Sequence, residues 1–168
     1  MFLDGKVIVI TGVGPGMGRK LATIAAAEGA KVVASARSEG TIAETVKEIT
    51  AAGGQAIAVR CDVTDKAQCA ALAEAALDRF GRIDGLINSA YRFSYAHTLE
   101  DNDLDEWEKT MDATCWGALR MIKAVLPAMK RQGGGSIVNV STRSTVLPVP
   151  GEGAYVVAKE AMHGATRH

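Results

Sequence analysis

The feature that most constrains the fold is a regular alternation between short apolar runs and longer amphipathic stretches. Apolar runs rich in β-branched residues occur at 6–11, 31–37, 55–63, 83–90 and 135–141. Stretches with the apolar spacing of a helix separate them, at 18–29, 41–54, 65–81 and 104–133, and another begins at Glu152. Because a helix between two strands makes a right-handed crossover to a parallel neighbour, this order predicts an α/β fold. We expect a doubly wound parallel β-sheet with helices on both faces.

The composition fits one domain and disfavours two classes of partner. The 168 residues are 48% hydrophobic and 23% charged, which suffices for a single domain over 1–168 with its own core. Nineteen basic residues balance nineteen acidic residues, so the net charge favours neither a nucleic acid nor an anionic membrane. We expect no nucleic acid and no membrane among the partners.

The cysteines and the N-terminal segment indicate the compartment. Cys61, Cys69 and Cys115 form no CxxC pair, so we expect free thiols, a reducing compartment and no metal site. The N-terminal segment is too short and too charged for a signal peptide, and no apolar run approaches the length of a membrane span. These features predict a cytoplasmic protein.

A glycine-rich turn, TGVGPGMG at 11–18, follows the first apolar run. In a parallel sheet, ligands bind at the carboxyl ends of the strands, where glycines let the backbone approach a pyrophosphate near a helix N-terminus. The GxGxxG spacing fails because Met17 or Arg19 takes the third glycine position, and the missing Lys-Ser or Lys-Thr excludes a Walker loop. The spacing TGxxxGxG fits instead, on Thr11, Gly12, Gly16 and Gly18. A plain structural turn would also explain the glycines, but its place between strand and helix favours a dinucleotide site.

The residue type at the end of the second apolar run indicates which dinucleotide, NAD(H) or NADP(H), the site would prefer. A carboxylate there would bind a ribose 2′-hydroxyl, whereas an arginine suits a 2′-phosphate. The sequence VVASARS places Arg37 there and has no carboxylate. Arg37 could also be a solvated charge at a strand end. We favour NADP(H) over NAD(H).

Three further motifs point to a known family. They are Asp62 in CDVTD, FGRIDGLINSA at 80–90, and YVVAK at 155–159 with STRST before it at 141–145. With the glycine loop, and in this order and spacing, they make the chain resemble the classical short-chain dehydrogenase/reductase family over essentially its whole length. The resemblance implies a Rossmann-type form of the doubly wound sheet.

The resemblance also implies roles for individual residues. Asp62 would meet the adenine amino group, and Asn88 lies where the motif of the fourth strand begins. With Arg37 included, the expected cofactor-binding set is Thr11, Gly12, Gly16, Met17, Gly18, Arg37, Asp62, Val63, Asn88 and Lys159. The implied catalytic set is Tyr155 as acid/base, Lys159 on the nicotinamide ribose, and Thr142 or Ser141 on the substrate oxygen.

The pair Tyr155 and Lys159 has an independent physical basis. Residues four apart share one face of a helix, and an unperturbed tyrosine titrates near pH 10, too high for proton exchange at neutral pH. A positive charge about 4 Å away is worth roughly 4 kcal/mol at an effective dielectric near 20, or about three pKa units. Lys159 is therefore expected to lower the pKa of Tyr155 to near 7. An exposed pair without function is the alternative.

The sequence departs from the family at three positions. The family serine that binds the substrate oxygen lies thirteen residues before the tyrosine, where Thr142 stands here, with Ser141 and Ser144 nearby. A threonine hydroxyl can make the same hydrogen bond. Thr114 replaces a helix asparagine whose backbone carbonyl binds a relay water. Tyr91 replaces a glycine.

An aromatic segment follows the fourth apolar run. Tyr91, Phe93 and Tyr95 either line a pocket for a bulky or aromatic substrate or pack within their loop, and the sequence leaves both possibilities open.

These expectations combine into one function and one alternative. The first is an NADP(H)-dependent oxidoreductase that interconverts a small-molecule carbonyl and a secondary alcohol. The alternative is an NADP(H)-binding protein without turnover, acting as a sensor or scaffold subunit. The resemblance implies a homodimer or homotetramer. Family members continue with further strands beyond the tyrosine helix, so we expect this chain to be part of a longer protein.

Overall fold

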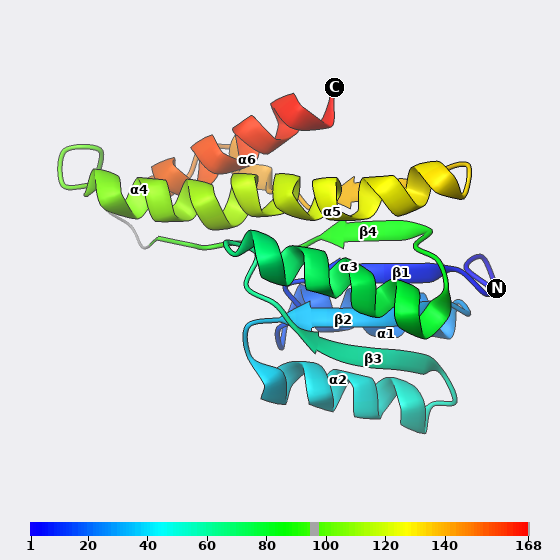
Figure 1. Ribbon diagram of the computed structural model, residues 1–168. Helices are drawn as coiled ribbons and strands as arrows, with labels where there is room; N and C mark the ends of the chain where they lie inside the picture. The colour runs from blue at the N-terminus through cyan, green and yellow to red at the C-terminus, as the bar shows by residue number, and fades with distance from the viewer. Residues whose placement is uncertain (95–97, 168) are drawn as a thin grey trace.

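The computed structural model describes residues 1–94 and 98–167 and contains the predicted parallel sheet (Figure 1). The strands are β1 (Val7–Thr11), β2 (Lys31–Ala36), β3 (Gln55–Arg60), β4 (Gly85–Asn88) and β5 (Ser136–Asn139). The helices are α1 (Met17–Ala27), α2 (Glu39–Ala51), α3 (Lys66–Phe80), α4 (Leu104–Met111), α5 (Gly117–Arg131) and α6 (Gly153–Thr166). The strand order is β3-β2-β1-β4-β5, and every neighbouring pair is parallel. The predicted α/β class is confirmed.

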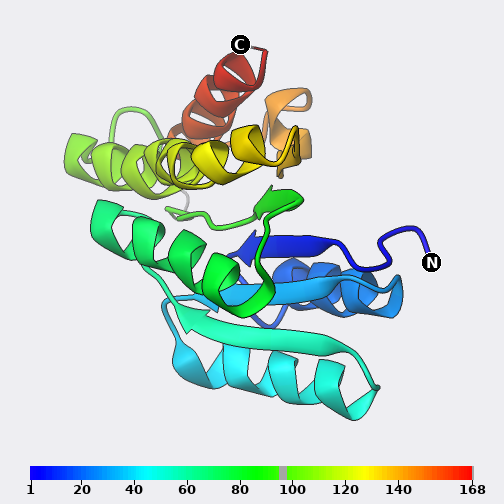
Figure 2. The same ribbon diagram turned by 45° about the vertical axis from the view of Figure 1, so that its right-hand side comes forward.

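Helices cover both faces of the sheet, and each face has its own apolar core. In β1, Val7 and Val9 contact the core formed with α3 and α5, whereas Ile8 and Ile10 contact the core formed with α1 and α2. This division follows from the two-residue period of a strand. Figure 1 shows α3 and α5 in front of the sheet and α1 behind it, and Figure 2 shows the same two layers from the side. The β-branched runs are therefore buried on both faces, as a central parallel sheet requires.

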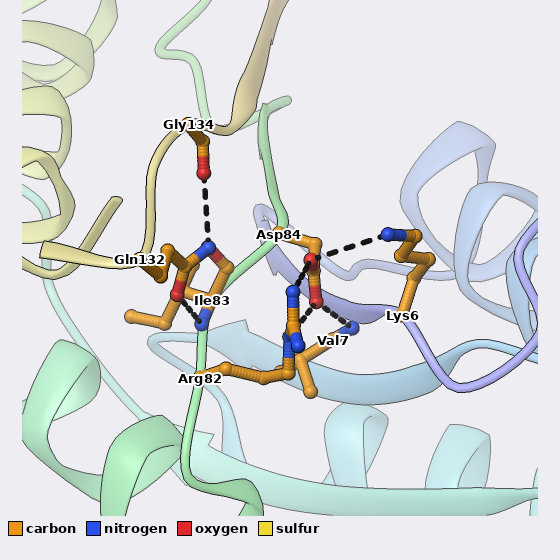
Figure 3. A network of polar contacts seen from close by, with 7 residues as sticks. All are labelled: Lys6, Val7, Arg82, Ile83, Asp84, Gln132 and Gly134. Carbon is orange, nitrogen blue, oxygen red and sulfur yellow. Dashed lines mark hydrogen bonds and ion pairs between the residues drawn. The ribbon is translucent and has the colours of Figure 1, made fainter. Parts of the chain in front are cut away.

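A polar network closes the sheet at the amino ends of its strands (Figure 3). The Asp84 carboxylate accepts a hydrogen bond from the Val7 N–H at 3.0 Å and forms ion pairs with Arg82 at 2.6 Å and Lys6 at 3.6 Å. Burial would raise the pKa of Asp84, but the hydrogen bonds from Arg82 and Val7 and the two positive charges outweigh it and hold that pKa below its usual value. This network ties β1 to the start of β4, opposite the carboxyl ends where ligands bind.

The long helix predicted over 104–133 is interrupted. α4 ends at Met111, a π-helical turn η1 (Asp112–Trp116) follows, and α5 then continues from Gly117. The helical spacing of apolar residues over 104–133 continues through η1. The sequence therefore does not indicate the one additional residue that a π-turn inserts into the helix. Such single π-turns occur frequently at functional sites.

The strands are shorter than the apolar runs that predicted them. Within the runs at 55–63, 83–90 and 135–141, the strands end at Arg60, Asn88 and Asn139, respectively. The residues that follow leave the sheet at its carboxyl edge. Their apolar or small side chains extend the pattern, but their backbone forms the loops of the site.

Candidate active site

Two loops meet where β1 and β4 end. The Thr11 hydroxyl oxygen accepts hydrogen bonds from the backbone N–H groups of Ser89 at 3.2 Å and Ala90 at 3.3 Å. Gly12 has a positive φ of 71°, and a Cβ there would lie 2.5 Å from the Ala90 nitrogen. Only glycine combines this conformation with this close approach. Thr11 and Gly12 thus join the glycine loop to the loop after β4.

The other glycines of the loop divide into two kinds. A Cβ on Gly18 would lie 2.2 Å from the Gly12 carbonyl oxygen, so Gly18 lets α1 pack against the loop. A Cβ on Gly14 or Gly16 would have no described neighbouring atom within 4 Å. The loop therefore leaves open space on this side, above the start of α1, where Met17 is exposed and a helix N-terminus offers free N–H groups.

A cavity of about 520 Å³ occupies this space. Its lining comes from the loops after β1, β2, β3 and β4 and from the α4–η1 region: Gly12, Val13, Gly14, Pro15, Ala36, Arg37, Ser38, Thr41, Cys61, Asp62, Val63, Thr64, Ser89, Ala90, Tyr91, Arg92, Lys109, Asp112 and Ala113. The predicted residues Gly12, Arg37, Asp62 and Val63 are among them. Four separate loops thus converge on one site at the carboxyl edge of the sheet, as the topology requires.

One arginine, Arg37, lines the cavity at the end of β2. Arg37 is exposed, and its carbonyl oxygen accepts a hydrogen bond from Arg60 Nε at 3.3 Å. Arg60 is opposite Ala36 in the register of β2 and β3. The Arg37 guanidinium and the start of α2 after Ser38 favour an anion at this end.

Asp62 forms a tight turn just after β3, in the lining of the cavity. Its Oδ1 accepts hydrogen bonds from the Thr64 N–H at 3.0 Å and the Thr64 hydroxyl at 2.8 Å, and its own N–H donates to the Gln68 side chain. The carboxylate is therefore held in place at the cavity wall. This position is compatible with the predicted contact to an amino group.

Asn88 is buried beneath the site rather than in its lining. Its amide nitrogen donates to Asn139 Oδ1 at 2.9 Å and to the Ala118 carbonyl at 3.4 Å, which ties β4 to β5 and α5. In the described part of the chain, Asn88 Oδ1 and the nearby Ser35 Oγ are buried side-chain atoms without a partner. Such atoms are costly unless a ligand or water satisfies them.

Tyr155 and Lys159 share one face of α6, as their spacing predicted. Lys159 is 1% exposed, and its ammonium group donates to the Val140 carbonyl oxygen at the end of β5. Lys159 Nζ lies 5.7 Å from the centroid of the Tyr155 ring. At the carboxyl edge of the sheet, Lys159 is therefore buried and Tyr155 is half-buried.

The pKa values differ from the sequence expectation. Burial lowers the pKa of Lys159 to about 8. Burial also raises the pKa of Tyr155, and a hydrogen bond with Thr142 only partly opposes this rise. The predicted lowering of the Tyr155 pKa by Lys159 is thus wrong for this structure, because Lys159 is itself desolvated and directs its ammonium group to Val140.

The hydroxyl groups before α6 point to different partners. Thr142 caps the short 3₁₀ turn η2 (Arg143–Thr145) and contacts both the N–H and the hydroxyl of Ser144, besides its hydrogen bond with Tyr155. Ser141 Oγ instead contacts His163 Nε2. The structure brings Thr142, and not Ser141, to Tyr155.

Thr114 lies in the π-turn η1 and is fully buried. Its hydroxyl oxygen accepts a hydrogen bond from the Arg92 N–H at 3.1 Å. Arg92 also forms an ion pair with Glu106 of α4 at 2.6 Å. The side chain that replaces the family asparagine therefore anchors the loop after β4.

Two aromatic rings of that loop contact Tyr155. The Tyr91 and Phe93 ring centroids lie 5.6 Å and 5.2 Å from the Tyr155 centroid, in tilted and edge-on arrangements. Tyr91 also lines the cavity, so it connects the glycine-loop side of the site with Tyr155. Tyr95, the third aromatic residue of the prediction, lies outside the described residues.

Within residues 1–94 and 98–167, no group of three or more His, Cys, Asp or Glu residues could hold a metal ion. No helix in that part of the chain is long and apolar enough to cross a membrane. The cysteines Cys61, Cys69 and Cys115 are buried and free, as expected.

The family model described as short chain dehydrogenase matches residues 6–168. The chain belongs to the short-chain dehydrogenase family. The resemblance inferred from its motifs is confirmed.

Relatives of this short-chain dehydrogenase share both sequence and fold. An uncharacterized oxidoreductase of Thermotoga maritima is 37% identical over 167 residues, covering 99% of this chain and 65% of the relative. A trans-4-hydroxycyclohexanecarboxylate dehydrogenase of Sinomonas cyclohexanicum is 38% identical over 168 residues, covering 96% of this chain and 64% of the relative. The crystal structure of levodione reductase matches with a TM-score of 0.93 and 31% identity, covering 98% of this chain and 65% of that one. The chain thus spans somewhat less than two thirds of the length of these relatives.

Proposed function

We propose that the protein is an NADP(H)-dependent oxidoreductase that interconverts a carbonyl compound and a secondary alcohol. The observation that carries the proposal is the position of Tyr91, which lines the glycine-loop cavity and contacts the ring of Tyr155. Tyr155 is half-buried, and the buried Lys159 lies on the same face of α6. A cavity for a dinucleotide and a proton-donating group therefore adjoin.

The residues present fit a nicotinamide dinucleotide. The open side of Gly14 and Gly16 leaves room for a pyrophosphate at the start of α1. When bound, the nicotinamide supplies or accepts the hydride. Asp62 would hold the adenine end, and Lys159 would bind the ribose next to the nicotinamide.

Three side chains of the protein would handle the reacting oxygen. Tyr155 would give its hydroxyl proton to the carbonyl oxygen during reduction and take it back during alcohol oxidation. Thr142, whose hydroxyl opposes the rise in the pKa of Tyr155, would hold the same oxygen. The positive charge of Lys159 would stabilise the tyrosinate that forms when Tyr155 releases its proton.

The preference for NADP(H) rests on charge. Arg37 lines the cavity at the end of β2, and the sequence has no carboxylate at this strand end. A 2′-phosphate would be bound by the Arg37 guanidinium, whereas a 2′-hydroxyl would find no carboxylate acceptor there.

The aromatic rings support a cyclic or otherwise bulky substrate. Tyr91 and Phe93 lie against Tyr155 and give the reaction site flat apolar walls. One relative is named for the oxidation of a hydroxylated cyclohexane ring. We therefore include cyclic ketones and cyclic secondary alcohols in the proposed substrate class.

Tyr155→Phe tests the oxidoreductase function against the non-catalytic alternative. In the full-length protein, the variant should lose at least about a hundredfold in the rate of NADPH oxidation with cyclic ketones. Its affinity for NADPH, measured by protein fluorescence, should remain unchanged. Tight NADPH binding by the wild type without turnover on a broad carbonyl panel would favour the sensor or scaffold.

Arg37→Asp tests the cofactor assignment separately. The change should weaken NADPH binding far more than NADH binding, because only NADPH carries the 2′-phosphate. Lys47→Asp, an equal charge change on exposed α2, is the control. Equal losses for both cofactors would contradict the assignment.

We also propose a homodimer or homotetramer that uses the outer surface of η1 and α6. Trp116 and Val157 are 52% and 43% exposed there and line a shallow apolar pocket. Trp116→Asp should shift the full-length protein to a smaller species in light scattering. An unchanged mass would contradict this interface.

A further inference from the structure

The helix that carries Tyr155 and Lys159 lies outside both apolar cores. Among the described residues, the two core clusters draw their members from the strands, from α1, α2, α3 and α5, and from adjoining loops. α6 instead packs against α4 and η1 above the sheet (Figure 1). The alignment of α6 with the end of β5 must therefore depend on other contacts.

Three successive residues at the end of β5 supply such contacts. Asn139 Nδ2 donates to Thr166 Oγ1 at 2.9 Å. The Val140 carbonyl oxygen accepts from Lys159, and Ser141 Oγ contacts His163 Nε2.

The partners on α6 occupy a single face of the helix. Tyr155, Lys159, His163 and Thr166 follow one another at intervals of four, four and three residues, which places all of them on one side. A shift of α6 along β5 would break all three contacts at once. The contacts of Lys159, His163 and Thr166 thus fix the position of this face of α6, which also carries Tyr155, relative to the end of β5.

The contact between Ser141 and His163 adjoins Thr142 in the sequence. Ser141 directly precedes Thr142, the hydroxyl group that reaches Tyr155. On the other side of the imidazole, His163 Nδ1 faces Glu160 Oε2 at 3.5 Å. A carboxylate there favours the tautomer with a proton on Nδ1, which leaves Nε2 to accept the Ser141 hydroxyl proton. The ring is therefore held between α6 and the end of β5.

We infer that His163 is a positioning residue that, through Ser141, aligns Thr142 with Tyr155. The inference rests on the proposed oxidoreductase function. In this proposal Ser141 helps to position Thr142, and Thr142 alone of the two binds the substrate oxygen. His163 acts at the junction of two elements that are far apart in sequence, and it requires no contact with substrate or cofactor.

The test uses Ser141→Ala, His163→Leu, the double variant and His163→Gln in the full-length protein. Loss of one hydrogen bond should lower kcat with a cyclic ketone by about threefold to tenfold, and the NADPH affinity should stay unchanged. The double variant should be no slower than the slower single variant, because both changes break the same contact. His163→Gln should recover most of the rate, since its amide can replace Nε2. Ser136→Ala, at the opposite end of β5 from the Ser141 loop, is the matched control.

Hydrogen–deuterium exchange provides a readout that does not need turnover. Residues 139–145 should lose protection in Ser141→Ala and His163→Leu but not in Ser136→Ala. If the wild type turns over no carbonyl compound, the proposed function fails, and the exchange result alone decides the positioning claim. Additive rate losses, a change confined to NADPH affinity, or unchanged exchange in 139–145 would overturn the inference. Burst hydrolysis of p-nitrophenyl acetate that disappears in Ser141→Ala would also overturn it, because Ser141 would then be a nucleophile.

Discussion

Lys159→Met should make the protein more stable at neutral pH while it abolishes turnover. Lys159 is 1% exposed, and burial lowers its pKa from 10.5 to about 8. The folded state thus disfavours the charged form that predominates below pH 8. One pKa unit corresponds to about 1.4 kcal/mol, so a shift from 10.5 to about 8 means that the charge costs about 3 kcal/mol at pH 7.

The substitution also has a cost of its own. Methionine has nearly the shape of lysine without the charge, but it cannot donate to the Val140 carbonyl oxygen. An unsatisfied buried acceptor costs about 1–3 kcal/mol. The variant should therefore be more stable than the wild type by about 1 kcal/mol at pH 7.

The sign of the pH dependence separates this explanation from simple repacking. Because the pKa of Lys159 is lower in the folded state, the unfolded chain binds more protons between pH 8 and 10.5, and stability gains with rising pH. This contribution is complete above pH 10.5 and is lost as the pH falls through about 8. The advantage of Lys159→Met should therefore shrink between pH 7.5 and 9.5.

Urea unfolding of the wild type and the variant at pH 7.0, 8.5 and 9.5 measures this directly. Lys109→Met, which removes a 58% exposed side chain of α4, serves as the control and should show no such trend. A variant less stable than the wild type at pH 7 would refute the reasoning, as would a stability difference that does not change with pH. Loss of ketone reduction in Lys159→Met is expected in either case.

The remaining predictions concern the loops and the amino ends of the strands. Gly12→Ala should lower the free energy of unfolding by about 2–4 kcal/mol, because φ is positive and the new Cβ would lie 2.5 Å from the Ala90 nitrogen. Gly14→Ala should keep the Tm but weaken NADPH binding. Equal losses of Tm in the two variants would contradict the different roles assigned to Gly12 and Gly14. Asp84→Asn should cost about 1–3 kcal/mol in urea at pH 7, and the difference from wild type should fade as the pH drops below about 4, since the lowered pKa of Asp84 makes its contribution disappear there. Thr114→Val should raise KM for the ketone with little change for NADPH, because the Arg92 N–H loses its acceptor; an unchanged KM would count against a role for this anchor.

The parallel sheet with helices on both faces could be predicted because it depends on local periodicity and on general rules for crossovers. The β-branched run at Val7–Thr11 is buried on both faces, and such a strand can only lie centrally. The need for glycine at position 12 was also readable, since its place after β1 requires a close approach. Tyr155 and Lys159 could be placed on one face because their spacing alone decides it.

Other features depend on tertiary contacts that no local pattern contains. The π-turn around Thr114 leaves the apolar spacing unchanged, and the partner of its hydroxyl lies 22 residues earlier at Arg92. The contact between Ser141 and His163 depends on how α6 crosses β5. The raised pKa of Tyr155 was missed because burial, which is its largest cause, cannot be inferred from the position of one lysine.

The two edges of the sheet differ in how their polar groups are satisfied, and this difference supports the location of the site. At the amino edge, Asp84 engages Lys6, Arg82 and the Val7 N–H together. The described residues whose buried polar side-chain atoms lack partners are Ser35, Asn88, Arg92, Trp107, Thr110 and Glu152. All of these belong to strand ends, loops or helices at or beyond the carboxyl edge, where α4 and α6 lie in Figure 1.

A buried polar atom without a partner lowers stability, so a fold keeps such atoms only where something else depends on them. The desolvated ammonium of Lys159 is a further cost at the same edge. Stability alone would favour pairing or replacing these groups, as the amino edge illustrates. Their location at the carboxyl edge is what we expect of a fold that binds a polar cofactor and a reacting oxygen there. The stabilising effect expected for Lys159→Met measures one part of that cost.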